Sequence, residues 1–145
     1  MATPAAPRPR TSLELRWDGG SRLVATAGGH EQLCDWDGKE GLSPVQTLAL
    51  ALAGCMASDV VTILQKGRLP LRGLRAVLAA ERAEEEPRRF LSVDLRFEIA
   101  GDVPAARVER AIALSRDKYC SVWHSMRQDI AFTTSFEIRA EASSP

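Results

Sequence analysis

The sequence predicts an α+β fold with largely antiparallel sheets and two long helices, in the element order β-β-β-α-β-β-α-α-β. Two observations predict this class. Segments in which apolar and polar residues alternate, which is the period of a strand, come in pairs separated by turn residues. Helical segments lie between these pairs. Strands in pairs with helices between the pairs favour an α+β fold and a largely antiparallel sheet.

The N-terminal part is expected to form three short strands. The turns Asp18-Gly19-Gly20 and Gly28-Gly29 separate apolar runs, which is typical of hairpins. A polar, glycine-containing loop follows. The expected elements are strands at Thr11–Trp17, Ser21–Ala27 and His30–Trp36, and a loop over Asp35–Gly41.

A long central helix is expected to begin at Ser43-Pro44, where serine supplies an N-cap oxygen and proline fits the first helical position. It should run to Lys66, with Gly67 as its C-cap. Its residues are apolar on nearly all sides, which predicts a buried helix. Gly54 in its middle costs about 1 kcal/mol relative to alanine, so we expect a close packing contact there.

The second half of the chain alternates strand and helix patterns again. An acidic turn, Glu84-Glu85-Glu86-Pro87, should connect two strands into a long hairpin. Later in the chain, Ser121 is a candidate N-cap for a short helix. The expected elements are strands at Leu74–Ala80, Leu91–Ile99 and Phe132–Arg139, and helices at Pro104–Arg116 and Ser121–Gln128.

Length and charge exclude several classes of function. A chain of 145 residues fits one domain, expected over residues 11–140 with disordered tails at 1–10 and 141–145. The net charge of zero predicts no broad attraction to nucleic acid or to an anionic membrane. The first residues lack the apolar core of a signal peptide, and Val45–Leu64 is judged too polar for a membrane span. These features predict a cytoplasmic protein.

The cysteines are the main candidates for chemistry. Cys120 precedes a predicted short helix, whose N-terminus favours a thiolate, and Cys55 lies in the long helix. If the two sulfurs meet, one could attack a peroxide and the other could resolve the sulfenic acid as a disulfide. The alternative is that both pack as small hydrophobic residues. Cys34 has no obvious partner and is interpreted as structural.

A metal site is a second hypothesis for these residues. Cys120 and His124 are four positions apart, and Cys55 or His30 could complete a site. Structural zinc sites, however, usually carry closely paired cysteines or histidines, and this chain has no such pair. No metal and no cofactor are therefore predicted, and His124 is expected on the helix surface or in a dimer interface.

Two segments together resemble one family. Gly41-Leu42-Ser43-Pro44 leads into a helix that carries Ala53-Gly54-Cys55 and Asp59, and Leu114-Ser115 precedes Lys118-Tyr119-Cys120. This combination resembles the OsmC/Ohr family, the osmotically inducible and organic hydroperoxide resistance proteins. The resemblance extends over roughly Ser12 to Ala140 and is closest to the less characterised OsmC-like branch.

The resemblance implies an intertwined homodimer with the long helices at its centre. It implies that Cys55 attacks the peroxide and that Cys120 resolves the sulfenic acid. The implied substrates are organic or fatty-acid hydroperoxides, and the implied reductant is a dithiol such as a lipoylated protein. The alternative is a non-enzymatic dimer that senses redox state or binds a small ligand.

One departure from the family pattern favours this alternative. The best-studied peroxidases of the family have a glutamate directly after the proline and an arginine near the first hairpin, which orient each other and stabilise the thiolate. Here Val45 and Gln46 follow the proline, and neither is a carboxylate. Arg22 is the first candidate for the arginine and Arg16 the second, while Gln46 could hydrogen-bond the arginine without pairing its charge.

Overall fold

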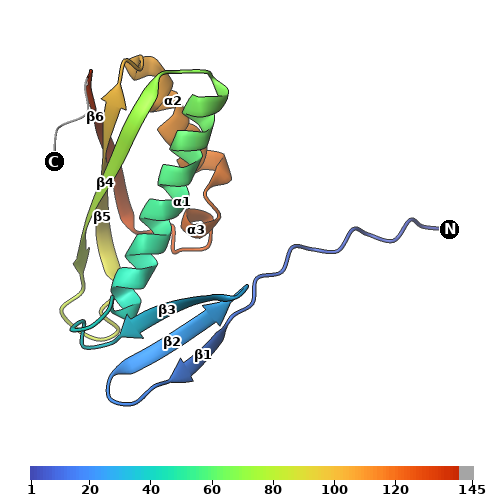
Figure 1. The fold of residues 1–145 in the computed structure, drawn as a ribbon, viewed down its shortest axis with the longest axis vertical. Coiled ribbons are helices and arrows are strands. Elements are labelled where there is room, and N and C mark those ends of the chain that lie inside the picture. The colour runs from blue at the N-terminus through green and yellow to red at the C-terminus, as the bar shows by residue number, and fades with distance from the viewer. Residues whose placement is uncertain (141–145) are drawn as a thin grey trace. The chain divides into compact units, whose positions relative to one another are not determined.

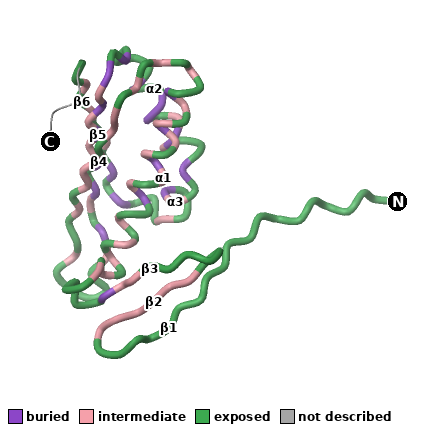
Figure 2. The backbone as a smooth tube through the Cα atoms, viewed as in Figure 1, coloured by how far each residue is buried: buried purple, intermediate pink, exposed green. Residues whose placement is uncertain are grey.

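The computed structural model describes residues 1–140, and the predicted tail 141–145 lies outside the described residues. The α+β class and the predicted element order are confirmed (Figure 1). The chain divides into two compact units, Met1–Leu48 and the part from Ala49 onward. Residues 1–10 are exposed and lie outside helices and strands (Figure 2). The elements are β1 Glu14–Trp17, β2 Arg22–Ala27, β3 His30–Asp35, α1 Pro44–Lys66, β4 Leu71–Arg82, β5 Phe90–Gly101, α2 Ala105–Leu114, η1 Ser115–Tyr119, α3 Ser121–His124 and β6 Ala131–Arg139.

The first unit contains an antiparallel sheet in the order β1-β2-β3. Gly19 and Gly20 both have positive φ, 86° and 56°, so the turn between β1 and β2 needs residues without a Cβ. The Trp17 indole donates a hydrogen bond to the Gly20 carbonyl at 3.0 Å. Strand β1 begins at Glu14 and is shorter than predicted. Its first residue, Glu14, pairs with Thr26, and β2 extends only one residue beyond Thr26.

Helix α1 begins where the sequence predicts, with a reciprocal pair of hydrogen bonds at its first turn. The Gln46 N–H donates to Ser43 Oγ at 3.2 Å, and the Ser43 N–H donates to Gln46 Oε1 at 2.9 Å. This is a capping box, with Pro44 at the first helical position. The start of the helix that carries Cys55 is thus determined by residues next to it in sequence.

The C-terminal end of α1 differs from the prediction in one residue. Gly67 does follow Lys66 directly, but the left-handed residue is Arg68, whose φ is 57°. The Leu69 N–H donates to the Leu64 carbonyl at 3.2 Å, and the Arg68 N–H donates to the Gln65 carbonyl at 2.9 Å. These two bonds form a Schellman motif.

The prediction that α1 is buried on nearly all sides is wrong within this chain. Its buried side chains form one stripe at every fourth position, Leu52, Met56, Val60 and Leu64. The contact expected at Gly54 is also absent among the described residues, since nothing lies within 4 Å of a Cβ built there. The chain itself covers one side of α1 and leaves an apolar remainder uncovered.

The prediction that Val45–Leu64 is too polar for a membrane span is wrong when only length and composition are considered. Helix α1 has 23 residues, its most apolar window has a mean hydropathy of 1.9, and 22% of that window is buried. Core helices of soluble proteins reach the same hydropathy, so these values alone do not assign α1 to a membrane.

The second unit contains a sheet in the order β4-β5-β6, in which β4 and β5 form the predicted long hairpin. Strand β6 is parallel to β5, a pairing the sequence did not indicate. Parallel neighbours require a crossover of a dozen or more residues, and here the crossover contains α2, η1 and α3. Central strand β5 buries alternate residues, as predicted, at Val93, Leu95, Phe97 and Ile99.

Leu91 was expected to continue this buried face, but its side chain is 43% exposed. The pairing of β4 with β5 shifts there: Glu81 faces Ser92 whereas Arg82 faces Phe90, so Leu91 is the extra residue of a bulge. Phe90 is buried instead. A shift of one residue reverses which side chain faces the core.

The crossover is the part of the fold that positions Cys120. Helix α2 ends at Leu114, two residues before the predicted end, and continues as the π-helical turn η1. Helix α3 also ends early, at His124, and the Gln128 side chain donates to the Trp123 carbonyl at 2.9 Å. Trp123 is buried, with its ring centroid 4.5 Å from that of Phe132.

Candidate functional site

Cys120 is completely buried and caps the N-terminus of α3. Its backbone is extended, with φ −73° and ψ 97°, and its sulfur accepts a hydrogen bond from the Trp123 N–H at 3.3 Å. The sequence pointed to Ser121 as the N-cap, and this is wrong by one residue. The thiol thus takes the role that a serine hydroxyl usually has.

Cys55 is the direct neighbour of this thiol. The pKa of Cys120 is raised to about 11, with burial of the thiol as the largest cause. A hydrogen bond and charge interaction with the Cys55 side chain also raise the pKa, whereas the hydrogen bond from the Trp123 N–H lowers it. The expectation that the helix terminus would favour a thiolate at Cys120 is therefore wrong, because desolvation outweighs it. At neutral pH, Cys120 is a protonated thiol beside Cys55, which is only partly buried, and both are free.

This raised pKa predicts a loss of stability at alkaline pH. Between pH 9 and pH 11 the thiol ionises in the unfolded chain but keeps its proton in the folded chain, so the free energy of unfolding falls as pH rises. The slope from one such group is about 1.4 kcal/mol per pH unit. Urea unfolding of the reduced protein at intervals from pH 8 to pH 11 measures it.

The matched variant for this measurement is Cys120→Ser, whose hydroxyl does not titrate in this range. This variant should lose the contribution of Cys120 to the fall in the free energy of unfolding at alkaline pH. The contributions of all other groups should remain. Equal slopes in the two proteins between pH 9 and pH 11 would contradict the raised pKa.

A second contact joins α1 to the crossover one helical turn beyond Cys55. The Ser115 hydroxyl, which is completely buried, donates to Asp59 Oδ2 at 2.8 Å. The Cys120 N–H in turn donates to the Ser115 carbonyl at 2.7 Å and closes the π-helical turn. Helix α1 therefore contacts the crossover at both Cys55 and Asp59.

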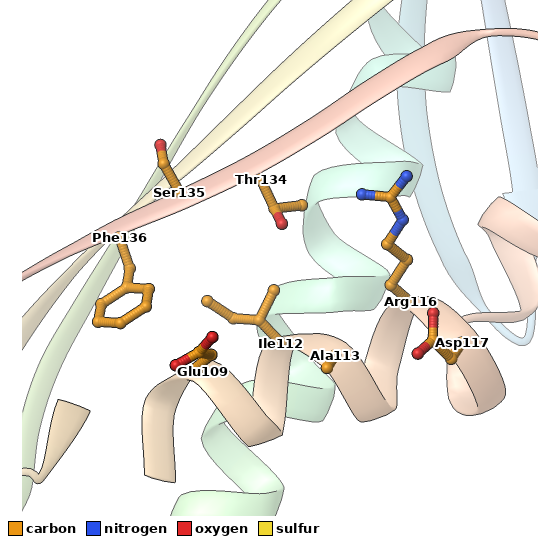
Figure 3. A pocket seen from close by; sticks show the side chains of 8 residues that line it. All are labelled: Glu109, Ile112, Ala113, Arg116, Asp117, Thr134, Ser135 and Phe136. Carbon is orange, nitrogen blue, oxygen red and sulfur yellow. The ribbon is translucent and has the colours of Figure 1, made fainter. Parts of the chain in front are cut away.

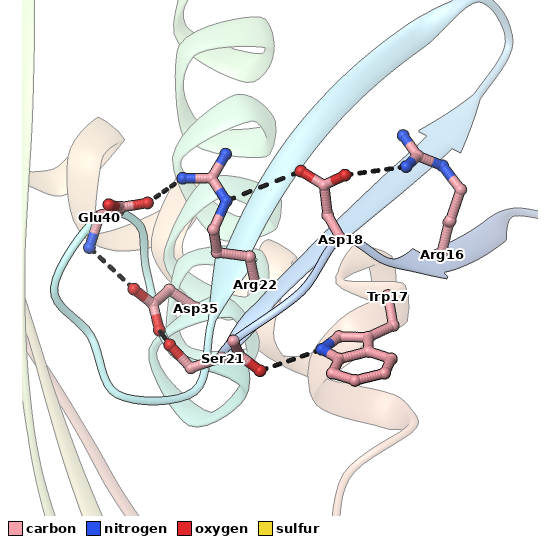
Figure 4. Close-up of polar contacts among 8 residues, drawn as sticks. Arg16, Trp17, Asp18, Ser21, Arg22, Asp35 and Glu40 are labelled. Atoms are coloured by element: carbon pink, nitrogen blue, oxygen red, sulfur yellow. Dashed lines mark hydrogen bonds and ion pairs between the residues drawn. The ribbon is translucent and has the colours of Figure 1, made fainter.

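The first unit contains the predicted arginine in a group of charged side chains (Figure 4). Arg22 forms an ion pair with Glu40, and its Nε lies 3.7 Å from Asp18 Oδ2. Glu40 lies four positions before Pro44, in the loop predicted between β3 and the helix. Arg22 thus has a carboxylate partner, although neither Val45 nor Gln46 supplies one. Sequence reasoning missed Glu40 because it lies 18 positions from Arg22.

Asp35 holds the loop that carries Glu40. Its carboxylate is 1% exposed and accepts hydrogen bonds from the Ser21 hydroxyl at 2.6 Å and from the N–H groups of Asp37 and Glu40 at 2.9 Å. The Ser21 bond is the largest cause that lowers the pKa of Asp35 below its usual value. Asp35 therefore stays ionised, and its contact with the Glu40 backbone places the Glu40 side chain beside Arg22.

The other predicted residues of this unit have different partners. Gln46 Oε1 accepts the Ser43 N–H in the capping box, and the prediction that Gln46 orients Arg22 stays a prediction. Arg16 pairs with Asp18 at 3.0 Å. Cys34 is partly buried in β3, opposite Leu23.

Residues 1–140 contain no group of three or more His, Cys, Asp or Glu side chains that could hold a metal ion. His124, the candidate metal ligand beside Cys120 in sequence, is exposed at the end of α3.

A cavity of about 750 Å³ lies in the second unit between the crossover and β6 (Figure 3). The guanidinium of Arg116 lies 4.8 Å from the centre of the Phe132 ring. The lining mixes apolar, hydroxyl and charged groups, and sequence reasoning missed it because two separate segments supply them. They include Ile112, Arg116 and Asp117 from the crossover and Thr134, Ser135 and Phe136 from β6.

Comparison with known proteins identifies the family. The family model described as OsmC-like protein matches residues 37–135, which include Cys55, Asp59, Ser115 and Cys120. The chain belongs to the OsmC-like family. Protein YhfA of Escherichia coli K12 is 40% identical to this OsmC-like protein over 129 residues, which are 87% of this chain and 96% of YhfA.

Solved structures share the fold of this OsmC-like protein. A hypothetical protein from Aquifex aeolicus matches with a TM-score of 0.85 and 23% identity, over 91% of this chain and 98% of that chain. The organic hydroperoxide resistance protein OhrB of Bacillus subtilis matches with a TM-score of 0.61 and 13% identity, over 88% of this chain and 98% of that chain. At these identities the likeness establishes the fold alone.

Proposed function

We propose that this OsmC-like protein is a thiol-dependent peroxidase that reduces organic or fatty-acid hydroperoxides. The observation that carries the proposal is the pair formed by Cys55, which is partly exposed, and Cys120, which is buried and protonated. The shared fold of an organic hydroperoxide resistance protein supports it. An accessible sulfur beside a protected one suits a pair in which the first attacks and the second resolves.

The reaction proceeds in three steps. The Cys55 thiolate attacks the terminal peroxide oxygen, the O–O bond breaks, and the alkoxide takes a proton and leaves as an alcohol. The Cys120 sulfur then attacks the Cys55 sulfenic acid, its proton leaves with the hydroxide as water, and a disulfide forms. A dithiol reductant, such as a lipoylated protein, restores both thiols by two exchange reactions and becomes a disulfide itself.

Arg22 is the cation that we propose for stabilising the Cys55 thiolate. Its ion pairs with Glu40 and Asp18 support this role, because a guanidinium held by carboxylates keeps one orientation. Glu40 then takes the place of the glutamate that the best-studied peroxidases have after the proline. Gln46 contributes by capping the helix that carries Cys55.

We also propose that the working form is a homodimer. Helix α1 buries one stripe of side chains, while Leu48 and Leu50 are 43% and 48% exposed and Gly54 has open space beside it. Leu13, just before strand β1, and Leu15 and Trp17 within it are exposed as well. Apolar surface of this kind is unfavourable in water and marks an interface. A second copy of the chain is the partner that we propose covers it.

The proposed location is the cytoplasm, where thiols stay reduced and dithiol reductants are present. The three cysteines, which are all free, fit that environment.

The test is single-turnover kinetics of the reduced protein with cumene hydroperoxide and with a fatty-acid hydroperoxide. We expect the protein to consume peroxide at least 100-fold faster than free cysteine at the same pH, and to consume one equivalent per Cys55. A rate equal to that of free cysteine would favour the non-enzymatic alternative, a redox-sensing or ligand-binding dimer, which the absence of a glutamate after Pro44 supports.

A further inference from the structure

The turn that leads into Cys120 is wider than an α-helical turn. Residues Ser115–Tyr119 form a π-helical turn, and the Cys120 N–H closes it by donating to the Ser115 carbonyl five residues earlier, at 2.7 Å. Such turns are rare, and they occur frequently at functional sites. The position of the Cys120 sulfur therefore depends on the position of this π-helical turn.

Ser115 holds the turn against α1. Its side chain is completely buried, and its hydroxyl donates to Asp59 Oδ2 at 2.8 Å. Asp59 lies one helical turn after Cys55, so both side chains project from the same side of α1. Thus the Ser115–Asp59 hydrogen bond fixes the beginning of the π-helical turn. Cys120, which directly follows the turn, contacts Cys55.

We propose that Asp59 and Ser115 are positioning residues for the Cys55–Cys120 disulfide. They hold the π-helical turn so that Cys120 can meet Cys55 with the geometry that a disulfide requires. The inference rests on the proposed function for the step it concerns, which is resolution of the oxidised Cys55. It adds two residues that touch neither the peroxide nor the reacting sulfurs.

The geometry of a disulfide explains why the position of the π-helical turn matters. A disulfide needs an S–S distance near 2.05 Å and a dihedral angle near 90°, so a small displacement of either backbone disfavours the bond. Correct placement of two reacting groups gives a large rate advantage, which a displacement of about 1 Å can remove. If Asp59 loses its carboxylate, the Ser115 hydroxyl remains buried without its acceptor and the turn is free to shift.

The test measures the disulfide without any peroxide. Reduced protein is equilibrated in buffers of reduced and oxidised dithiothreitol, quenched with acid, and the fraction with a Cys55–Cys120 disulfide is determined by mass spectrometry. We expect Asp59→Ala and Ser115→Ala each to lower the equilibrium constant at least tenfold, which corresponds to about 30 mV in potential. Asp59→Asn keeps an oxygen that can accept the Ser115 hydroxyl, and its constant should stay within threefold of wild type.

Ser58→Ala is the matched control. The Ser58 hydroxyl donates to the Cys55 carbonyl at 2.8 Å, so this variant removes a neighbouring hydrogen bond on α1 without touching the crossover. It should leave the constant unchanged. A second readout is trapping of the Cys55 sulfenic acid with dimedone after one equivalent of peroxide, where Asp59→Ala should accumulate at least ten times more adduct than wild type.

Each outcome gives a clear answer. A purely structural role for Asp59 would lower the stability of reduced and oxidised protein equally and leave the equilibrium constant unchanged, and this would overturn the inference. An Asp59→Asn variant as defective as Asp59→Ala would also overturn it, because charge would then matter instead of position. If wild type forms the disulfide and the constants shift as expected but peroxide is not consumed, the inference holds and the proposed function fails.

Discussion

Replacement of Cys55 by serine is expected to abolish peroxide consumption, with a loss of at least 100-fold, whereas Cys120→Ser should still consume one equivalent. The reason is the different exposure of the two sulfurs: Cys55 is partly accessible, and Cys120 is completely buried with a pKa raised to about 11. Only the accessible thiol can meet a hydroperoxide, and only the thiolate attacks it. Without Cys120, the oxidised Cys55 should persist as a sulfenic acid.

Stopped-flow peroxide consumption and mass spectrometry of the quenched protein measure these two outcomes. Cys34→Ser is the matched control, because Cys34 is partly buried in β3, opposite Leu23, and has no part in the proposed reaction. It should leave the rate unchanged. Unchanged consumption by Cys55→Ser would contradict the assignment of the attacking thiol. A Cys120→Ser protein that turns over repeatedly with a dithiol reductant, at the wild-type rate, would contradict the resolving role of Cys120.

Replacement of Gly54 by leucine is expected to separate the proposed homodimer into monomers. Nothing in the described part of the chain lies within 4 Å of a Cβ at this position, so leucine causes no clash inside one copy. In a dimer formed through the uncovered side of α1, glycine would permit close approach of the second copy, and a leucine would prevent it. We expect the dimer dissociation constant to rise at least 100-fold.

Sedimentation velocity over a range of protein concentrations measures this equilibrium, since one chain has a mass of 15.8 kDa and the dimer twice that mass. Arg110→Leu, which introduces the same side chain at an exposed position of α2, should leave the dissociation constant unchanged. A Gly54→Leu protein that dimerises as tightly as wild type would place Gly54 outside the interface. A monomeric wild type at micromolar concentration would contradict the homodimer itself.

The sequence predicted those elements whose geometry depends on residues that are close together in the chain. Ser43, Pro44 and Gln46 are neighbours, and their hydrogen bonds alone define the start of α1. The alternation in β5 likewise predicted its buried face. The exposed Leu91 was missed because a bulge depends on pairing with β4, and the parallel pairing of β6 was missed because it depends on the path of the whole crossover.

The candidate site shows the same division. Spacing alone could not bring Cys55 and Cys120 together, because 65 positions separate them, and only the resemblance to a family suggested the pair. The protonation of Cys120 was predicted with the wrong sign, since a helix terminus is visible in the sequence whereas the burial of the thiol is not. The link between Asp59 and Ser115 joins residues 56 positions apart and has no local signature.

The π-helical turn of Ser115–Tyr119 has a consequence for how the chain length can vary. Each residue of an α-helix rotates the chain by about 100°, so deleting one residue there would convert the turn toward a regular helix and direct position 120 away from Cys55. The hairpin connection between β4 and β5 imposes no such restriction, because it lies at the end of two strands. Insertions and deletions among relatives that keep the cysteine pair should therefore occur in that hairpin and be absent between Ser115 and Cys120.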